Sequence, residues 1–182
     1  MIQLSPLFLW RFAVMLLTSQ FDRRKIALLL ASAVLQLHDT HWLRRSWTLE
    51  DILVMENNEL CVSCNFDDAS QNHPPSTTNT AVILRNETLF ALGEALLELV
   101  YQVPLSSPDP QTRLCTALEM ARKLQNDELE NFATAVAKCL CPTSPTILDF
   151  DLSQDSFLNW YYQEIVMPLK EDYEVFLKRS YT

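Results

Sequence analysis

The chain has 182 residues, of which 48% are hydrophobic and only one, Gly93, is a glycine, and its formal net charge is −9. A chain of this length can bury about 70% of the surface that it exposes when unfolded, so a single domain with a hydrophobic core is expected. Phosphate-binding loops use several glycines to bring backbone N–H groups against the ligand, which excludes such a loop here. The acidic balance, with two short basic clusters at 23–25 and 44–45, argues against binding to nucleic acid.

Residues 1–20 form an apolar N-terminal segment, in which Leu4–Leu17 carries a single charge at Arg11. A membrane-spanning helix needs about 20 apolar residues, and a signal peptide needs positive charge before its apolar stretch. The segment meets neither requirement. We therefore expect an edge helix or the remnant of a longer chain, and no interaction with a membrane.

Residues 21–182 are predicted to form a second unit, a mainly helical domain with one small β-hairpin. Asp22 can cap the first helix, whose apolar residues recur at helical spacing and also cover its other faces, which indicates burial on most sides. Two short β-branched and aliphatic segments, Ile52–Met55 and Leu60–Phe66, flank a polar turn and predict an antiparallel hairpin. The polar segment Asp67–Thr80 is predicted to be a flexible loop.

Further helices follow this loop. One is predicted from Asn86 or Thr88 to about Tyr101, and another is centred on residues 114–124. A fourth is predicted to open at an Asp127 cap, and an aromatic helix near the C-terminus is expected to be interrupted by Pro168.

The two most apolar helices are predicted to lie at the centre of the domain. The leucines expected to be fully buried there are Leu30, Leu37, Leu92 and Leu96. Gly93 is expected to permit the close approach of another helix, because it has no side chain to keep a neighbour away.

The five cysteines form one CxxC and one CxC pattern without a matching set of histidines. An odd number argues against a disulfide scaffold, and Cys61 and Cys64 continue a strand pattern that points them to opposite faces. Buried, reduced cysteines are the better interpretation, and they suggest a cytoplasmic protein.

An enzyme of another kind would have to draw its catalytic or metal-binding groups from one small set of residues, namely His38, Asp39, His41, Cys61, Cys64, Asp67 and Asp68. No serine or cysteine lies on a recognisable nucleophile turn. The histidines would share a helix face only if the helix continued through residues 39–40, which favour its end. We therefore expect capping or surface histidines, no metal and no cofactor.

Several segments resemble the C-terminal lobe of a protein kinase. Leu35–His38 is similar to the end of the helix before a kinase catalytic loop, and Phe90–Gly93 with Leu96–Leu99 resembles the kinase helix that contains Ser-Leu-Gly. Ala135–Leu140 is similar to the later helix that ends in Cys-Leu. The chain as a whole resembles a fungal domain family of unknown function built on this lobe, which often accompanies prion-inhibition-and-propagation domains.

The resemblance assigns degenerate residues to the kinase catalytic positions. With Ile52–Val54 as the anchor, the His-Arg-Asp motif reads Arg44, Arg45, Ser46, and the magnesium-binding Asn is replaced by Asp51. The second magnesium-binding position is held by Asn65, followed two residues later by Asp67 in place of glycine. The full set of degenerate positions is Arg45, Ser46, Asp51, Asn65, Asp67 and Thr88, the last of which replaces an Asp that braces the catalytic loop.

The resemblance therefore implies a catalytically inactive, pseudokinase-like interaction domain without a kinase N-lobe, which binds no nucleotide. The implied setting is fungal cell-death or incompatibility signalling. The alternative is a structural helical domain, or a truncated gene product, with no activity of its own.

The surface that an N-lobe covers in a kinase would here carry large apolar side chains. The candidate interface consists of Trp42, Leu43, Trp47 and Leu49. Exposed aromatic surface usually marks a protein interface, so we expect it to be covered by a protein partner or by the chain's own Leu4–Leu17 segment. The alternative is that the two tryptophans turn inward and complete the core.

Overall fold

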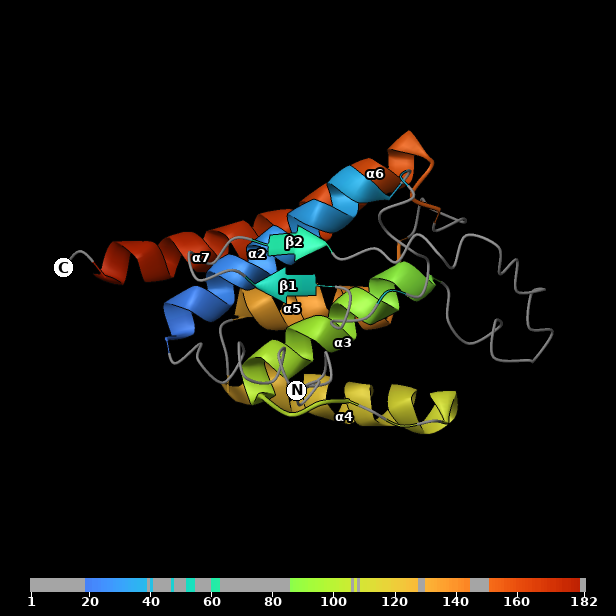
Figure 1. The fold of residues 1–182 in the computed structure, drawn as a ribbon, viewed down its shortest axis with the longest axis horizontal. Helices are drawn as coiled ribbons and strands as arrows, with labels where there is room; N and C mark the ends of the chain where they lie inside the picture. The colour runs from blue at the N-terminus through green and yellow to red at the C-terminus, as the bar shows by residue number, and fades with distance from the viewer. Residues whose placement is uncertain are drawn as a thin grey trace, which may run out of the picture.

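The computed structural model describes residues 19–38, 40, 47, 52–54, 60–62, 86–105, 107, 109–127, 130–144 and 151–180. The elements in chain order are α2 (Gln20–Leu37), β1 (Ile52–Val54), β2 (Leu60–Val62), α3 (Glu87–Tyr101), α4 (Pro110–Asp127), α5 (Glu130–Leu140), α6 (Asp155–Tyr161), η4 (Tyr162–Val166) and α7 (Met167–Ser180). The predicted mainly α class is confirmed (Figure 1). The predicted loop Asp67–Thr80 and the N-terminal segment 1–18 lie outside the described residues.

Helix α2 starts earlier than the sequence analysis predicts. Its N-cap is Ser19, whose hydroxyl accepts a hydrogen bond from the N–H of Phe21 at 3.1 Å, and Asp22 lies within the first turn. The prediction that Asp22 caps the helix is therefore wrong, because a serine three residues earlier supplies the capping oxygen. Leu30 is buried as predicted, whereas Leu37 is only half-buried because it ends the helix.

Strands β1 and β2 pair in antiparallel fashion, with Ile52 opposite Val62 and Val54 opposite Leu60. Figure 1 shows β2 in front of α2, and β2 contacts this helix. Ile52 is buried and belongs to the same hydrophobic cluster as the helices.

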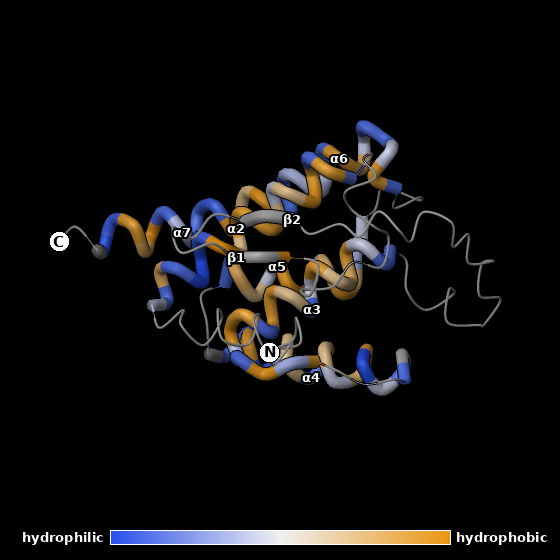
Figure 2. The backbone as a smooth tube through the Cα atoms, in the orientation of Figure 1, coloured by the Kyte–Doolittle hydropathy of each residue, from blue (hydrophilic) through white to orange (hydrophobic). Residues whose placement is uncertain are grey.

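Helix α3 is the most buried helix of the domain, and Figure 2 shows the hydrophobic colour along most of its length. It begins at Glu87, between the two predicted starts, Asn86 and Thr88. The side-chain oxygen of Asn86 accepts a hydrogen bond from the N–H of Leu89 at 2.9 Å and so caps the helix. Leu92 and Leu96 are fully buried, as predicted. A Cβ atom added to Gly93 would lie 2.8 Å from Cδ2 of Leu140, which confirms that this glycine permits close approach of α5.

Helix α5 lies at the centre of the helical packing, where it contacts α3, α4, η4 and α7. It begins at Glu130, while Asp127 is the last residue of α4. The prediction that α5 opens at an Asp127 cap is therefore wrong, because the preceding helix continues through that residue. The inward-facing residues of α5 include Phe132, Val136 and Leu140, as its apolar spacing predicts.

The C-terminal helices form one continuous helical segment, in which the π-turn η4 joins α6 to α7. The N–H of Met167 donates to the carbonyl of Tyr162, five residues earlier. The prediction that Pro168 interrupts the helix is wrong, because the wider turn that precedes it accommodates a residue that cannot donate a hydrogen bond. In Figure 1 the C-terminal end of α7 projects beyond the other helices.

Candidate functional site

Most of the positions that the kinase resemblance marks lie outside the described residues. They are Arg44, Arg45, Ser46, Asp51, Asn65 and Asp67. Thr88 is described, and its side chain is buried in the first turn of α3. The structure therefore places one of these residues and leaves the arrangement of the others as a prediction.

The histidine candidate for another chemistry lies at a helix end. Nδ1 of His38 is 2.8 Å from the carbonyl oxygen of Leu35, so the ring binds the last turn of α2 when Nδ1 carries the proton. This contact agrees with a capping role. Within the described ranges, no group of three or more His, Cys, Asp or Glu side chains could hold a metal ion. Asp39, His41, Cys64 and Asp68 lie outside those ranges.

Trp47 does not belong to the exposed candidate interface, because it is only 3% exposed. The prediction that Trp47 forms part of an exposed surface is therefore wrong, because its ring belongs to the hydrophobic core. Its indole N–H is buried without a hydrogen-bond partner. Trp42, Leu43 and Leu49 lie outside the described residues, so their exposure remains a prediction.

The cysteines do not share one environment. Cys139 is buried as predicted, but Cys115 and Cys141 are exposed, which corrects the expectation that the thiols are buried. Burial raises the pKa of the Cys139 thiol well above its ordinary value, so the group stays protonated and is a poor nucleophile. Burial also raises the pKa of Tyr161, whose hydroxyl donates a hydrogen bond to the carbonyl of Ala31 at 2.8 Å.

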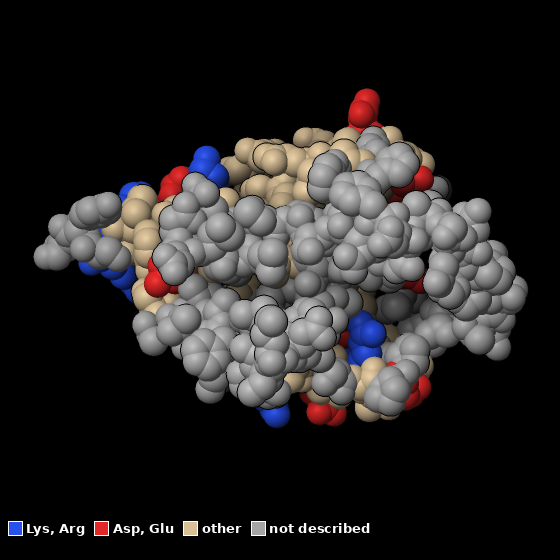
Figure 3. All heavy atoms as spheres, in the orientation of Figure 1, with Lys and Arg blue, Asp and Glu red and all other residues tan. Residues whose placement is uncertain are grey.

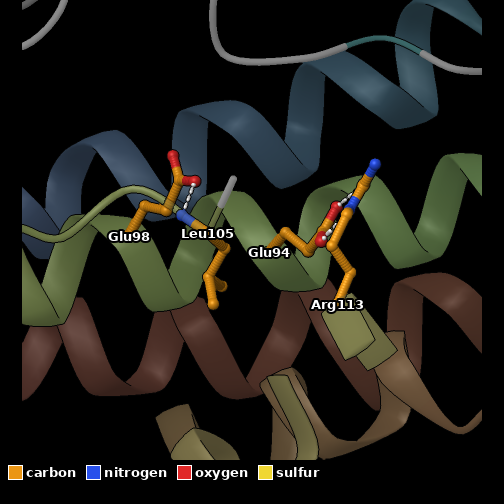
Figure 4. A network of polar contacts seen from close by, with 4 residues as sticks. All are labelled: Glu94, Glu98, Leu105 and Arg113. Atoms are coloured by element: carbon orange, nitrogen blue, oxygen red, sulfur yellow. Dashed lines mark hydrogen bonds and ion pairs between the residues drawn. The ribbon is translucent and has the colours of Figure 1, made fainter. Parts of the chain in front are cut away.

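Two glutamates of α3 hold the segment that follows this helix (Figure 4). Both carboxylate oxygens of Glu94 accept hydrogen bonds from the guanidinium of Arg113 on α4, one of them from Nε at 2.9 Å. These hydrogen bonds raise the pKa of Arg113. The same guanidinium lies 5.8 Å from the ring centroid of Phe90.

Glu98 binds both ends of the turn after α3. Its backbone carbonyl accepts from the N–H of Gln102 at 2.8 Å, and its carboxylate accepts from the N–H of Leu105 at 2.6 Å. Gln102 adopts the left-handed conformation, with φ 55°. Residues 102–105 are called the α3–α4 turn below.

A buried ion pair joins α2 to α7. Nε of Arg24 lies 2.7 Å from Oδ2 of Asp172, and each side chain is 1% exposed. The guanidinium carbon lies 4.8 Å from the ring centroids of both Phe132 and Phe176. Removing two charges from water is costly. The attraction between Arg24 and Asp172, together with the contacts of the guanidinium with the two rings, must offset this cost.

The sequence alone does not identify these polar groups as a set. Arg24 occupies the same helical stripe as Ala27, Ala31 and Val34, all of them buried, and a charge on an apolar stripe is a signal of a buried partner. Glu94 gives the same signal in the apolar sequence of α3. The partner residues could not be identified in this way, because they lie far away along the chain.

On the face shown in Figure 3, blue and red side chains are interspersed around the outline of the molecule, and neither colour forms a large patch among the coloured residues. None of the helices that the structure describes is long and apolar enough to cross a membrane.

These features define the class of protein as a mainly α-helical domain built around the contact between α3 and α5. The sequence shows the family to which the chain belongs. The family model of a domain of unknown function, DUF7580, matches residues 5–176, and the chain belongs to this family. Neither the comparison with curated proteins nor the comparison with solved structures found a match.

Proposed function

We propose that this chain is a catalytically inactive, kinase C-lobe-like interaction domain that acts in the cytoplasm and has no nucleotide, metal or cofactor of its own. One observation carries the proposal. The two segments whose sequences most resemble kinase helices, Phe90–Gly93 and Ala135–Leu140, contact each other through Gly93 and Leu140. The order of the elements around that contact, from α2 through the β-strands to α3, α4 and α5, supports the same arrangement.

The residue types at the catalytic positions support the absence of phosphoryl transfer. Ser46 takes the place of the carboxylate that accepts the proton of the substrate hydroxyl, and a serine hydroxyl needs a base of its own at neutral pH. Asn65 supplies an amide where a kinase has its metal-binding Asp, and Asp51 supplies a carboxylate where a kinase has its metal-binding Asn. The two metal ligands are therefore exchanged between their positions.

The proposed partner is another protein, or the chain's own segment Leu4–Leu17, seated on the surface that includes Trp42, Leu43 and Leu49. A fungal origin and a role in cell-death or incompatibility signalling belong to this proposal and rest on the family resemblance. Deletion of Met1–Thr18, which leaves the Ser19 cap of α2 in place, distinguishes the two coverings. If the segment covers the surface in cis, its deletion should produce a protein that binds hydrophobic dye and aggregates.

Thermal-shift titration with ATP and Mg²⁺ or Mn²⁺ tests the proposal. We expect no saturable stabilisation, because a ligand that binds only the native state raises its stability as RT ln(1 + [L]/Kd). The matched control is Asp51→Ala, which removes the carboxylate at the position of the kinase's metal-binding Asn. Saturable stabilisation at micromolar nucleotide that Asp51→Ala abolishes would contradict the proposal and would place a metal–nucleotide complex at the kinase-like position.

A further inference from the structure

We infer that α7 is a displaceable helix, and that the site it covers on α2 and α5 binds a helix of another protein. That helix is identified by its chemistry, because it must carry a carboxylate and an aromatic ring one turn apart, as α7 does in Asp172 and Phe176. The covered site is called the α7 seat below and consists of Arg24 on α2 and Phe132 on α5. The inference goes beyond the proposed function, because it uses none of the kinase-like catalytic positions.

The α7 seat holds α7 through a cation between two rings. Nε of Arg24 lies 2.7 Å from Oδ2 of Asp172, and the guanidinium carbon lies 4.8 Å from the ring centroids of Phe132 and Phe176. Asp172 and Phe176 are four residues apart, so they lie on the same face of α7. The seat is therefore complementary to a helix with an acidic residue followed four positions later by an aromatic one.

Other polar groups near the seat are engaged elsewhere or lie at its exposed edge. Nη1 of Arg23 donates a hydrogen bond to the carbonyl of Val100 on α3 at 3.1 Å. Nδ2 of Asn131 on α5 donates to Glu171 on α7 at 3.1 Å, in an exposed contact that contributes little to docking. Arg24 is the only buried cation among the described residues, so it is the group that selects the incoming carboxylate.

Few side chains of α7 are fully buried. In residues 167–179 the buried side chains are Leu169 and Asp172, whereas α3 buries ten of its residues. The rings of Phe21 and Tyr173 also meet, with 5.1 Å between their centroids, but both are half-buried. The attraction within a buried ion pair is largely cancelled by the cost of removing its charges from water, and both charges regain hydration when the helix leaves. The release of α7 therefore costs less free energy than the opening of α3 or α5.

The junction before α7 provides a place where the helix can bend. The N–H of Met167 donates to the carbonyl of Tyr162, five residues earlier, and Pro168 has no N–H to donate. Kinks in helices occur at proline and at π-turns. Bending here moves α7 while the buried side chains of Phe157 and Tyr161 keep α6 in place. In Figure 1 the far end of α7 already projects beyond the other helices.

A second copy of the chain is a poorer occupant of the seat than a different protein. If two copies exchanged α7, every contact with the seat would be one that already exists within a single chain. The exchange would gain nothing at the seat and would lose the freedom of two separate molecules. The net charge of −9 also makes two copies repel each other. A different protein can add contacts of its own and so compete with α7, which is present at high effective concentration.

Hydrogen exchange of the full chain, measured by mass spectrometry, tests the release of α7. In the intact chain, the amides of residues 170–179 should exchange at least about tenfold faster than those of α3 and α5. Asp172→Ala removes the carboxylate that faces Arg24, so it should speed the exchange of α7 by a further factor of at least about ten and change that of α3 and α5 less than about threefold. The matched control is Lys170→Ala, which removes an exposed ion pair with Glu174 and should change the exchange of α7 less than about threefold.

A fluorescein-labelled peptide of residues 167–180 tests the seat itself. Because α7 covers the seat in the intact chain, the peptide is titrated by fluorescence anisotropy against the full-length Asp172→Ala variant. We expect saturable binding that is at least about tenfold weaker when the peptide also carries Asp172→Ala.

Several results would overturn the inference. They are equal protection of α7 and α3 in the intact chain, loss of protection in α3 and α5 of Asp172→Ala, no binding of the peptide, and equal binding of both peptides. Stable dimers of the intact chain that exchange α7 would make a second copy the occupant and would overturn it as well. Nucleotide binding by the chain would contradict the proposed function and leave this inference unchanged.

Discussion

The contact of Gly93 with α5 provides the sharpest prediction about stability. A Cβ atom at this position would lie 2.8 Å from Cδ2 of Leu140 and 3.1 Å from both Cβ of Cys139 and Cγ of Leu140. Both Leu140 atoms can move by rotation of that side chain, whereas Cβ of Cys139 can move only if α5 shifts. Gly93→Val should therefore destabilise the domain by about 1 to 3 kcal/mol through overpacking.

This magnitude is the result of opposing effects. Replacing glycine within a helix gains about 0.5 to 1 kcal/mol of helix stability with alanine, and less with valine because it is β-branched. Gly93→Ala should therefore be close to neutral or destabilising by up to about 2 kcal/mol, since the overpacking opposes the gain in helix stability. The matched control is the pair Cys115→Ala and Cys115→Val at an exposed position of α4, because their difference measures the cost of a β-branched residue in a helix without any overpacking.

Urea unfolding of these variants measures the predicted change. A loss of about 1 to 3 kcal/mol lowers the Tm by about 2 to 12 °C for a chain of this size. In the double variant Gly93→Val with Leu140→Ala, the shorter side chain relieves the clash, so the double variant should lose at least about 0.5 kcal/mol less than the sum of the single losses. If Gly93→Val unfolds at the same urea concentration as Cys115→Val, the close contact between α3 and α5 does not exist.

Three further predictions concern other parts of the core and turn. Asp172→Ala should cost about 3 to 5 kcal/mol in urea unfolding, because it leaves the guanidinium of Arg24 buried without its partner, and a loss below about 1 kcal/mol would contradict the burial of the pair. Gln102→Gly should raise the free energy of unfolding by about 0.5 to 1 kcal/mol, because glycine adopts the left-handed conformation without strain, and a lower Tm would argue against that conformation. Burial raises the pKa of Cys139 and Tyr161. The folded chain therefore retains two protons that the unfolded chain releases above about pH 8.5 for the thiol and about pH 10 for the phenol. The free energy of unfolding should fall as the pH rises past about 9, because the unfolded chain then binds fewer protons. Cys139→Ala should make this fall shallower, and an unchanged slope in urea unfolding between neutral and alkaline pH would contradict the burial of the thiol.

Local sequence signals predicted the central helices because the apolar spacing lies within one stretch of chain. The predicted start of α3, at Asn86 or Thr88, brackets the observed start at Glu87, and the structure adds that the side chain of Asn86 caps the helix. A glycine lowers the stability of a helix, so a glycine within an apolar helix indicates that the close packing of a neighbour offsets this loss. Gly93 could be predicted as a contact point for this reason. Boundaries were harder to place: Ser19 and Asp22 are both suitable capping residues, and nothing local decides between them.

Features that depend on distant parts of the chain could not be predicted. The apolar position of Arg24 indicates a buried charge, but its partner Asp172 follows 148 residues later, and only the fold brings the two together. The π-turn before Pro168 has no clear sequence pattern, because it depends on how η4 packs against α5. The inward orientation of Trp47 likewise depends on the core that surrounds it.

The most direct test of the proposed kinase-like arrangement is an experimental structure of the full chain that shows residues 44–67. This segment carries every kinase-like catalytic position except Thr88. We predict that the side chains of Ser46, Asp51 and Asn65 converge at one end of the β1–β2 pair, as the catalytic groups of a kinase do. If these three side chains point to different faces of the domain, the kinase-like arrangement is contradicted, and with it the proposal that this chain is an inactive relative of a kinase C-lobe.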